Sequence, residues 1–420
     1  MAKAYIPRVA DEELATRLSR IGAVLIEGVK GCGKTETARR RAKSEVLLDL
    51  DEQARETAKL VPRNILAGAA PRLLDEWQIV PGLWNAVRRE VDARGEDGQF
   101  ILTGSATPHD DETRHSGTAR FSRMRMRTMT LAETGLSSRQ VSLGALLRGE
   151  PVASGAAPAS FDDIIEECCR GGWPADRKRS LSQARANISD YVQEITYGDI
   201  RMPNRPRRDP TRLLGLLRAL AKNVASEATL VTLAQDTAAS GVQLDEDTVS
   251  VYLGALERLM VYEPLTAWSP VLRSKARVRT KPKHHLADPA LAAALLEAGP
   301  GELRRDLKTF GFLFESLVVR DLRVYAAVAD AQTHHYRDNT GMEVDVIVTA
   351  GFKRWAAFEV KLGTTGDVLD KAAANLLSFA AKVDVQSSGT PQILGIVTSG
   401  GCSYTRPDGV AVIPLATLDK

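Results

Sequence analysis

The first part of the chain alternates short apolar runs with stretches of helical character. The apolar runs have the length and composition of strands and cover residues 23–27, 45–51, 72–76, 100–105 and 124–131. Strands that alternate with helices are typical of a parallel sheet covered on both faces. Residues 1–150 are therefore predicted to form a doubly wound α/β domain.

The middle of the chain has mainly helical periodicity. Apolar residues recur at helical spacing in 161–170, 181–195, 211–222, 230–237 and 245–260. The last two of these segments are separated by a turn at Ala239, Ser240 and Gly241, and strand-like residues follow them. This order predicts a winged-helix-like domain over residues 151–300. Such modules either contact DNA or only pack against an ATPase core, and the pattern leaves both alternatives open.

The pattern changes again in residues 301–420. A helix is expected over 304–324, strands over 333–337, 342–349 and 355–362, a helix over 368–382 and a strand over 392–398. The residues Asp338, Asn339, Thr340 and Gly341 have the composition of a hairpin turn. A third domain of α-β-β-β-α-β order is predicted.

Length and composition agree with two or three globular domains. The chain has 420 residues, of which 44% are hydrophobic and 26% charged, and its net charge is +3. Because this charge is small, an argument for nucleic acid must rest on local patches. Four cysteines without paired metal-ligand spacing indicate a reducing compartment and no zinc site. No apolar run has the length of a membrane span, so a cytoplasmic protein without membrane contact is expected.

A glycine-rich segment follows the first strand and precedes a helical run. It consists of Gly28, Val29, Lys30, Gly31, Cys32, Gly33, Lys34 and Thr35. This is the G-x-x-x-x-G-K-T motif in the strand–loop–helix context that it requires. The glycines allow backbone N–H groups to surround phosphate oxygens, and the helix presents its amino end to them. We predict a nucleoside triphosphate site in which Lys34 reaches the β- and γ-phosphates and the Thr35 hydroxyl ligates Mg²⁺.

Two further strands end in residues that suit this site. Asp75 and Glu76 end the third strand, where Asp75 would hold Mg²⁺ through water and Glu76 would polarise the attacking water. Such a pair also occurs at solvated loop starts, but its spacing of one βαβ unit from the glycine-rich loop favours the catalytic interpretation. Thr103 and Ser105 end the fourth strand and could hydrogen-bond the γ-phosphate or its water, although a simple turn is the alternative.

Arginines are concentrated in residues 113–127. Arg123, Arg125 and Arg127 alternate with methionines, which indicates a strand with one solvated or phosphate-facing side. Arg114 and Arg120 precede this strand and are candidates for an arginine finger that acts in cis or on a neighbouring subunit.

A second basic row occupies residues 273–283. Its six cations stand at every second position: Arg273, Lys275, Arg277, Arg279, Lys281 and Lys283. In an extended segment they would share one edge at intervals of about 6–7 Å, which is close to the spacing of phosphates along a nucleic acid strand. A nucleic-acid role is predicted, and a solvated wing strand is the alternative.

Ionisable residues recur in one phase on two neighbouring strands of the third domain. Glu343 and Asp345 share a face of one strand, and Glu359 and Lys361 share a face of the next. Glu315 on the preceding helix would complete the cluster. Clustered carboxylates bind hard cations such as Mg²⁺ or Mn²⁺, and a nearby lysine stabilises charge that develops in phosphodiester cleavage. The alternative is a salt-bridge network of Asp345, Glu359 and Lys361 in a degenerate site.

These motifs together resemble the AAA-type ATPases that are fused to a DUF4143 C-terminal region. The resemblance rests on the glycine-rich loop, the Asp75–Glu76 pair, the strand end at Thr103 and the segment from Arg120 to Glu133. It departs from the family where Arg72 interrupts the aliphatic run and where Ala119 stands for glycine before Arg120. It implies ATP as the nucleotide.

The third domain resembles the PD-(D/E)xK nuclease fold. That resemblance implies that Asp345 and Glu359 bind metal, that Lys361 assists the attacking water, and that Glu315 contributes a metal or water contact.

The sequence therefore predicts an ATPase that couples its nucleotide state to DNA binding and to metal-dependent cleavage. The alternative is an ATP-gated regulator or defence module that binds DNA or a protein partner and has an inactive nuclease-like domain. A homo-oligomer is a further expectation.

Overall fold

The computed structural model describes residues 5–104, 117–199, 209–239, 241–270 and 281–420, and these divide into two compact units. The first unit comprises Met1–Thr128 with Leu256–Val261, and the second comprises Met129–Ala255 with Tyr262–Lys420. Within the described ranges, none of the helices combines the length and apolar composition that a membrane crossing requires.

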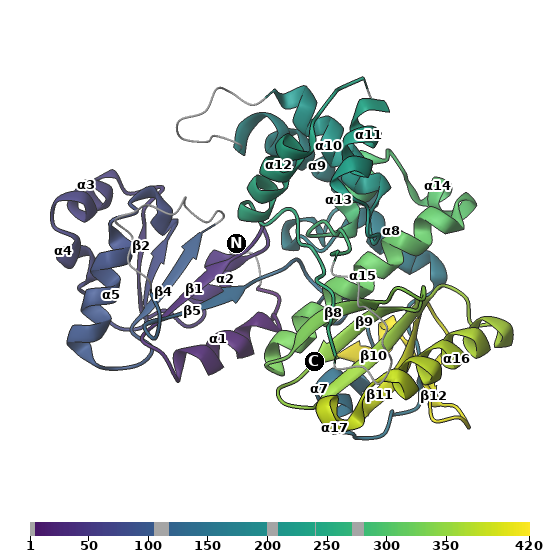
Figure 1. Cartoon of the computed structure of the whole chain (residues 1–420). Coiled ribbons are helices and arrows are strands. Elements are labelled where there is room, and N and C mark those ends of the chain that lie inside the picture. Colours follow the sequence, from purple (N-terminus) through teal and green to yellow (C-terminus); the bar gives the residue numbers. More distant parts are fainter. Residues whose placement is uncertain (1–4, 105–116, 200–208, 240, 271–280) are drawn as a thin grey trace. The chain divides into compact units, whose positions relative to one another are not determined.

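The first unit is built on a five-stranded parallel sheet in the order β2-β3-β4-β1-β5 (Figure 1). Its strands are β1 (Ala23–Glu27), β2 (Ser44–Leu47), β3 (Arg72–Asp75), β4 (Phe100–Gly104) and β5 (Phe121–Arg125). Its helices are α1 (Ala10–Leu18), α2 (Lys34–Arg39), α3 (Glu52–Leu60), α4 (Pro62–Leu66) and α5 (Leu83–Arg94), with a 3₁₀ turn at Trp77–Ile79. The strand β4 lies between β1 and β3, so the glycine-rich loop and Asp75 are not on adjacent strands.

Helices cover both faces of this sheet, as the alternating pattern predicts. One face packs Leu25, Leu74 and Leu102 against residues of α3, α4 and α5, including Trp84. The other face carries α1 and α2. The central strand β1 is buried along its whole length, which explains its continuous apolar run. The fold class predicted for this part of the chain is confirmed.

The last strand of this sheet begins and ends earlier than predicted. It covers Phe121–Arg125 rather than 124–131. Met126 and Met129 are nevertheless buried, and Leu131 is buried as the first residue of helix α6 (Leu131–Thr134). The side chain of Thr130 accepts the N–H of Glu133 and thereby starts this helix. A buried apolar run alone does not distinguish a strand from a capped helix.

The second unit contains a seven-stranded mixed sheet in the order β7-β12-β13-β11-β10-β9-β8. The strands are β7 (Gly155–Ala156), β8 (Gln332–Arg337), β9 (Glu343–Thr349), β10 (Trp355–Lys361), β11 (Pro391–Thr398), β12 (Cys402–Thr405) and β13 (Ala411–Pro414). Two further strands, β6 (Val141–Ser142) and β14 (Leu418–Asp419), pair with each other. The long helix α15 (Leu307–Val328) contacts β8, β9 and β10, while α16 (Gly366–Lys382) packs Leu376 and Phe379 on the sheet core (Figure 1).

The predicted α-β-β-β-α-β order is present as α15, β8, β9, β10, α16 and β11. In the hairpin between β8 and β9, Asp338 Oδ1 accepts hydrogen bonds from the N–H groups of Thr340 and Met342. Gly341 follows with φ 87°. The strands β12 and β13 were not predicted.

The segment 129–156 belongs to the second unit, because β6 and β7 pair with β14 and β12. The division into 1–150, 151–300 and 301–420 stays a prediction.

Helices make up most of residues 143–305. They are α7 (Leu143–Leu147), α8 (Phe161–Arg170), α9 (Leu181–Glu194), α10 (Pro210–Lys222), α11 (Leu230–Ala239), α12 (Glu246–Arg258), α13 (Pro289–Leu295) and α14 (Pro300–Arg305). A π-helical turn follows α9 at Ile195–Asp199, 3₁₀ turns lie at Pro174–Asp176 and Leu415–Thr417, and α17 spans Val385–Ser388. After α12, isolated antiparallel bridges join Tyr262 to Leu286 and Leu265 to Lys283.

A buried ionic network joins these helices within the second unit. Asp288 is fully buried and accepts hydrogen bonds from Arg320 Nη1 at 2.9 Å, from Gly172 N at 3.0 Å and from Ala290 N at 2.9 Å. The bond to Ala290 caps α13, and the bond to Gly172 holds the turn after α8. Arg320 also pairs with Asp321, whose carboxylate accepts the N–H of Leu131 at 2.9 Å.

We predict that Asp288→Ala lowers the free energy of unfolding of the second unit by about 3–5 kcal/mol, because it leaves the buried Arg320 guanidinium short of a counter-charge. Chemical denaturation followed by circular dichroism measures this change. Asp162→Ala removes an exposed partner of Arg304 and serves as the control, with little expected change. Equal stability of the Asp288 variant and the wild type would contradict the network's role.

Candidate functional site

The glycine-rich loop has the backbone geometry of a phosphate-binding loop. It runs from the carboxyl end of β1 to the start of α2, and Gly31 and Gly33 have φ values of 74° and 108°. These values suit glycine, because other residues rarely adopt this region. A Cβ atom on Gly28 would lie 2.1 Å from the carbonyl oxygen of Met126, so the close approach of the two segments also requires glycine.

Lys34 is buried and lies folded over the loop. Its Nζ donates to the carbonyl oxygens of Gly28 at 2.9 Å and Val29 at 3.1 Å. The ammonium is therefore held within the loop, where phosphate oxygens could take over the hydrogen bonds of the two carbonyls. Of the remaining loop residues, Cys32 is buried with its thiol donating to Met126 O at 3.7 Å, and Lys30 is exposed.

Thr35, Asp75 and Thr103 meet at the carboxyl edge of the sheet. Asp75 Oδ1 accepts a hydrogen bond from Thr35 Oγ1 at 2.9 Å and another from Thr103 Oγ1. This contact follows from the strand order, because Thr103 ends the strand that lies between β1 and β3. The hydroxyl and carboxylate oxygens are hard ligands of the kind that Mg²⁺ takes beside nucleotide phosphates. Thr35 and Asp75 thus fit the predicted magnesium position, and Thr103 holds the carboxylate of Asp75.

Glu76 follows Asp75 in an unusual backbone conformation. Its φ of 51° and ψ of 43° lie in the left-handed region, which costs a non-glycine residue about 1–2 kcal/mol. The conformation turns the chain sharply out of β3, and Gln78 Nε2 donates to Glu76 Oε2. The side chain of Glu76 is thus held by Gln78 at the residue directly after Asp75.

Arg120, one of the two arginine-finger candidates, is not brought to the loop of its own chain. Arg120 precedes β5 and its carbonyl accepts the N–H of Ala23, so it lies at the amino end of β1, opposite the glycine-rich loop. Its guanidinium pairs with the exposed Asp92 at 2.7 Å. The expected action of Arg120 in cis is therefore not supported, and its action on a neighbouring subunit stays a proposal. Arg114 and Ser105 lie outside the described residues.

Arg8 is a residue of this site that the sequence did not indicate. Its Nη1 donates to Cys32 O at 2.6 Å and its Nη2 to Arg127 O at 2.8 Å. The buried guanidinium thus ties the glycine-rich loop to the segment after β5. Nearby, Tyr5 contacts Thr37 on α2 through its hydroxyl at 2.9 Å. No local pattern marks an isolated arginine that bonds to two distant carbonyls.

The second group of predicted site residues converges in the second unit. Glu315 comes from α15, Glu343 and Asp345 from β9, and Glu359 and Lys361 from β10. Lys361 Nζ lies 2.6 Å from Glu359 Oε2 and 3.4 Å from Asp345 Oδ2. The phase read from the two strands thus places these groups as predicted. We call these five residues the carboxylate cluster.

A residue predicted to bind nucleic acid lies inside this cluster. Lys283 is 2% exposed, and its Nζ lies 2.7 Å from Glu315 Oε1, 2.8 Å from Glu343 Oε1 and 3.2 Å from Asp345 Oδ1. The prediction that Lys283 shares a nucleic-acid-binding edge with the rest of the basic row is wrong, because its ammonium group is buried among three carboxylates. Lys281 is exposed as expected, and the residues 273–279 of the row lie outside the described residues.

The electrostatics of the cluster favour a charged Lys283. Burial alone would lower the pKa of this lysine, but the carboxylates of Glu315, Asp345 and Glu343 raise the pKa well above its usual value. Burial opposes ionisation of Asp345 too, yet Lys283 and Lys361 lower its pKa to about 2. Burial raises the pKa of Glu315 to about 8, and burial together with Asp345 raises the pKa of Glu359 to about 7.

The cluster as it stands does not fit a metal ion. Asp345 Oδ1 faces Lys283, while Oδ2 accepts the N–H of Val360 at 2.9 Å. Glu359 Oε1 accepts from Asn375 Nδ2 at 2.8 Å, and its Oε2 faces Lys361. Among the residues that the structure describes, no three His, Cys, Asp or Glu side chains are arranged to hold a metal. The arrangement therefore does not support the metal roles expected of Glu315, Asp345 and Glu359.

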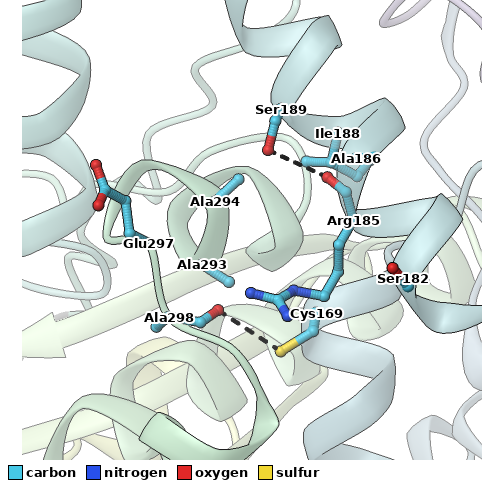
Figure 2. A pocket seen from close by; sticks show the side chains of 10 residues that line it. All are labelled: Cys169, Ser182, Arg185, Ala186, Ile188, Ser189, Ala293, Ala294, Glu297 and Ala298. Carbon is cyan, nitrogen blue, oxygen red and sulfur yellow. Dashed lines mark hydrogen bonds between the residues drawn. The ribbon is translucent and has the colours of Figure 1, made fainter.

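The helical part of the second unit contains a separate hollow, shown in Figure 2, between α9 and the end of α13. Alanines make up much of its lining, and Arg185 extends across it. The thiol of Cys169 points to the carbonyl oxygen of Ala298, and burial raises the pKa of this thiol to about 11. The thiol is thus protonated at neutral pH, and the lining offers little chemistry.

Three protein families match successive parts of the chain. Residues 21–135 match the AAA domain, and residues 310–418 match DUF4143, a domain of unknown function. Residues 161–302 match DUF8612, another domain of unknown function. The predicted combination of an AAA domain with a DUF4143 region is confirmed.

The chain is also similar to two whole mycobacterial proteins and to two solved structures. An uncharacterised protein of Mycobacterium tuberculosis and one of Mycobacterium bovis are each 26% identical over 419 residues, which covers 97% of this chain and 83% of theirs. A Walker-type ATPase of Pyrococcus abyssi is 14% identical, with a TM-score of 0.41 over 70% of this chain and 96% of its own. A DNA replication initiation factor is also 14% identical, with a TM-score of 0.24 over 59% and 86%.

We predict that Arg8→Ala weakens ATP binding by roughly 10- to 100-fold, because a charged hydrogen-bond donor to the loop carbonyl is worth about 1.5–3 kcal/mol. Fluorescence anisotropy of a labelled ATP analogue measures this affinity. The matched control is Arg17→Ala, which removes an arginine that pairs with Glu13 on α1 and does not contact the loop. An unchanged affinity in the Arg8 variant would show that the loop keeps its shape without this bond.

Proposed function

We propose that the protein hydrolyses ATP in its AAA domain and uses the nucleotide state to control binding by its second unit. The observation that carries the hydrolysis is the meeting of Thr35, Asp75 and Thr103 at the sheet edge, with Lys34 held in the glycine-rich loop. Asp75 and Thr103 lie at the ends of two neighbouring strands, while Lys34 and Thr35 begin α2, and packing alone does not call for them at one point.

Each side chain has a distinct part in the proposed reaction. Lys34 binds the β- and γ-phosphate oxygens in place of the loop carbonyls that it now contacts. Thr35 and Asp75 would hold Mg²⁺, which neutralises charge on the phosphates when bound. Glu76 orients the attacking water and accepts its proton. Thr103 keeps Asp75 in place by its hydrogen bond.

The binding partner that the sequence favours is DNA. The three helices α10, α11 and α12 precede two backbone segments bridged at Tyr262–Leu286 and Leu265–Lys283, which is the order of a winged helix. The basic residues Arg273, Lys275, Arg277 and Arg279 lie between the bridged segments in sequence. A protein partner is the alternative occupant, and a homo-oligomer would allow Arg120 to act on a neighbouring nucleotide.

Lys283 favours a binding role for the second unit over cleavage. Metal-dependent cleavage requires carboxylates that are available to a divalent cation, and here three of them face an ammonium group. The geometry therefore supports the regulator with an inactive nuclease-like domain better than the coupled nuclease.

We predict that Lys34→Ala abolishes ATP hydrolysis and weakens ATP binding, because the variant lacks the cation that binds the phosphates. Glu76→Gln should retain ATP binding and lower turnover by roughly 10²–10⁴-fold, the usual contribution of a general base. Phosphate release and a binding assay measure the two quantities. Glu52→Gln alters an exposed glutamate at the start of α3 and should leave both unchanged. Normal turnover in either site variant would refute the proposed roles.

We predict that the affinity for DNA differs between the ATP-bound and ADP-bound states. Anisotropy of a labelled duplex and a labelled single strand measures it, and Lys34→Ala should remove the difference. Joint replacement of Arg273, Lys275, Arg277 and Arg279 by glutamine should weaken binding and flatten its salt dependence. If neither the bound nucleotide nor these substitutions change the affinity for DNA, the proposed DNA-binding role is wrong. A protein partner then remains as the alternative.

A further inference from the structure

Main-chain hydrogen bonds on Lys283 and its neighbours fix the position from which its side chain enters the carboxylate cluster. Its N–H donates to Leu265 O at 3.0 Å, and its carbonyl accepts the N–H of Leu265 at 2.9 Å. On one side of it, Lys281 O accepts a hydrogen bond from His335 Nε2 at 2.9 Å. On the other side, the N–H of His284 donates to Ser226 O at 2.9 Å. The main chain thus directs this side chain inward, and the lysine is not a mobile surface group.

The number of N–H donors on the ammonium group matches the number of carboxylates around it, and its charge is opposite to theirs. It has three N–H donors, and the oxygens of Glu315, Glu343 and Asp345 lie 2.7, 2.8 and 3.2 Å from Nζ. The side chain supplies one of the cations that the buried carboxylates require. Lys361 is the second, and it lies on the far side of Asp345, at the other carboxylate oxygen.

A divalent metal and this ammonium exclude each other. Mg²⁺ requires oxygen ligands at about 2.0–2.1 Å in near-octahedral order. The carboxylate oxygens that would supply them already converge on Nζ, and two cations at one point repel strongly in a buried site.

We propose that Lys283 is a built-in cation that occupies the metal position of the carboxylate cluster and closes it to Mg²⁺ and Mn²⁺. The second unit of the wild-type protein then has no metal-dependent phosphodiesterase activity. Removal of the lysine exposes a divalent cation site made of the three carboxylates that now face it, those of Glu315, Glu343 and Asp345. This inference concerns the second unit alone and does not depend on ATP hydrolysis.

The test measures Mn²⁺ binding to the full chain without nucleotide, by electron paramagnetic resonance of the free ion. Asp345→Asn is added to each variant, and the Mn²⁺ binding that this substitution abolishes is assigned to the carboxylate cluster. Mn²⁺ binding that remains is assigned to other sites such as the glycine-rich loop. Lys283→Gln should bind one Mn²⁺ at least about 10-fold more tightly than the wild type, because a cation is removed while the carboxylates remain. Lys281→Gln, an exposed neighbour two residues away, should behave like the wild type.

A second variant keeps the test valid if Lys283→Gln does not fold. Lys283→Gln with Glu315→Gln removes one charge of each sign, and it should still bind Mn²⁺ more tightly than the wild type. The proposal is overturned if the wild type binds Mn²⁺ at the Asp345-dependent site as tightly as these variants. It is also overturned if the wild type cleaves plasmid DNA with Mn²⁺ and loses this activity in Asp345→Asn, because Lys283 would then accompany a working metal site.

Discussion

Charge buried away from water must be compensated, and this requirement determines how both units are built. Asp75 accepts hydrogen bonds from two threonine hydroxyls at the edge of the parallel sheet. Asp288 accepts bonds from Arg320 and from two backbone N–H groups. Asp345 lies between two lysines. In each case at least one compensating group comes from an element distant in the sequence, so the carboxylate also fixes how those elements pack.

In the AAA domain this compensation occurs at the proposed nucleotide site. The order of the strands brings Thr103 between the glycine-rich loop and Asp75, so one carboxylate organises the ends of three elements. Arg8 acts in the same way on the other side of the loop, where its guanidinium bonds to two backbone carbonyls. The loop is therefore shaped from outside the motif as well as by its glycines.

In the second unit, compensation of buried charge blocks a possible metal position instead of forming a nucleotide site. Three carboxylates of the region that matches DUF4143 converge on one point, and a lysine from the preceding region lies there with its positive charge. Because the ammonium is held by its backbone, the cluster joins the segment around Lys283 to α15 and β9. A group of residues that resembles a reaction centre thus acts as a structural junction, and the proposed coupling of ATP to binding does not require cleavage.

The sequence by itself determined the glycine-rich loop, the Asp75–Glu76 pair and the extents of several helices and strands, including β1, β9 and β10. These features follow from local periodicity and from residues close together in the chain. Only the tertiary structure decided that Arg120 lies away from its own loop, that Arg8 supports the loop, and that Lys283 faces carboxylates. Cations at every second position of an extended segment lie on the same edge. Their spacing does not show which groups of the folded protein that edge contacts. The partner of a buried charge is a property of the whole fold.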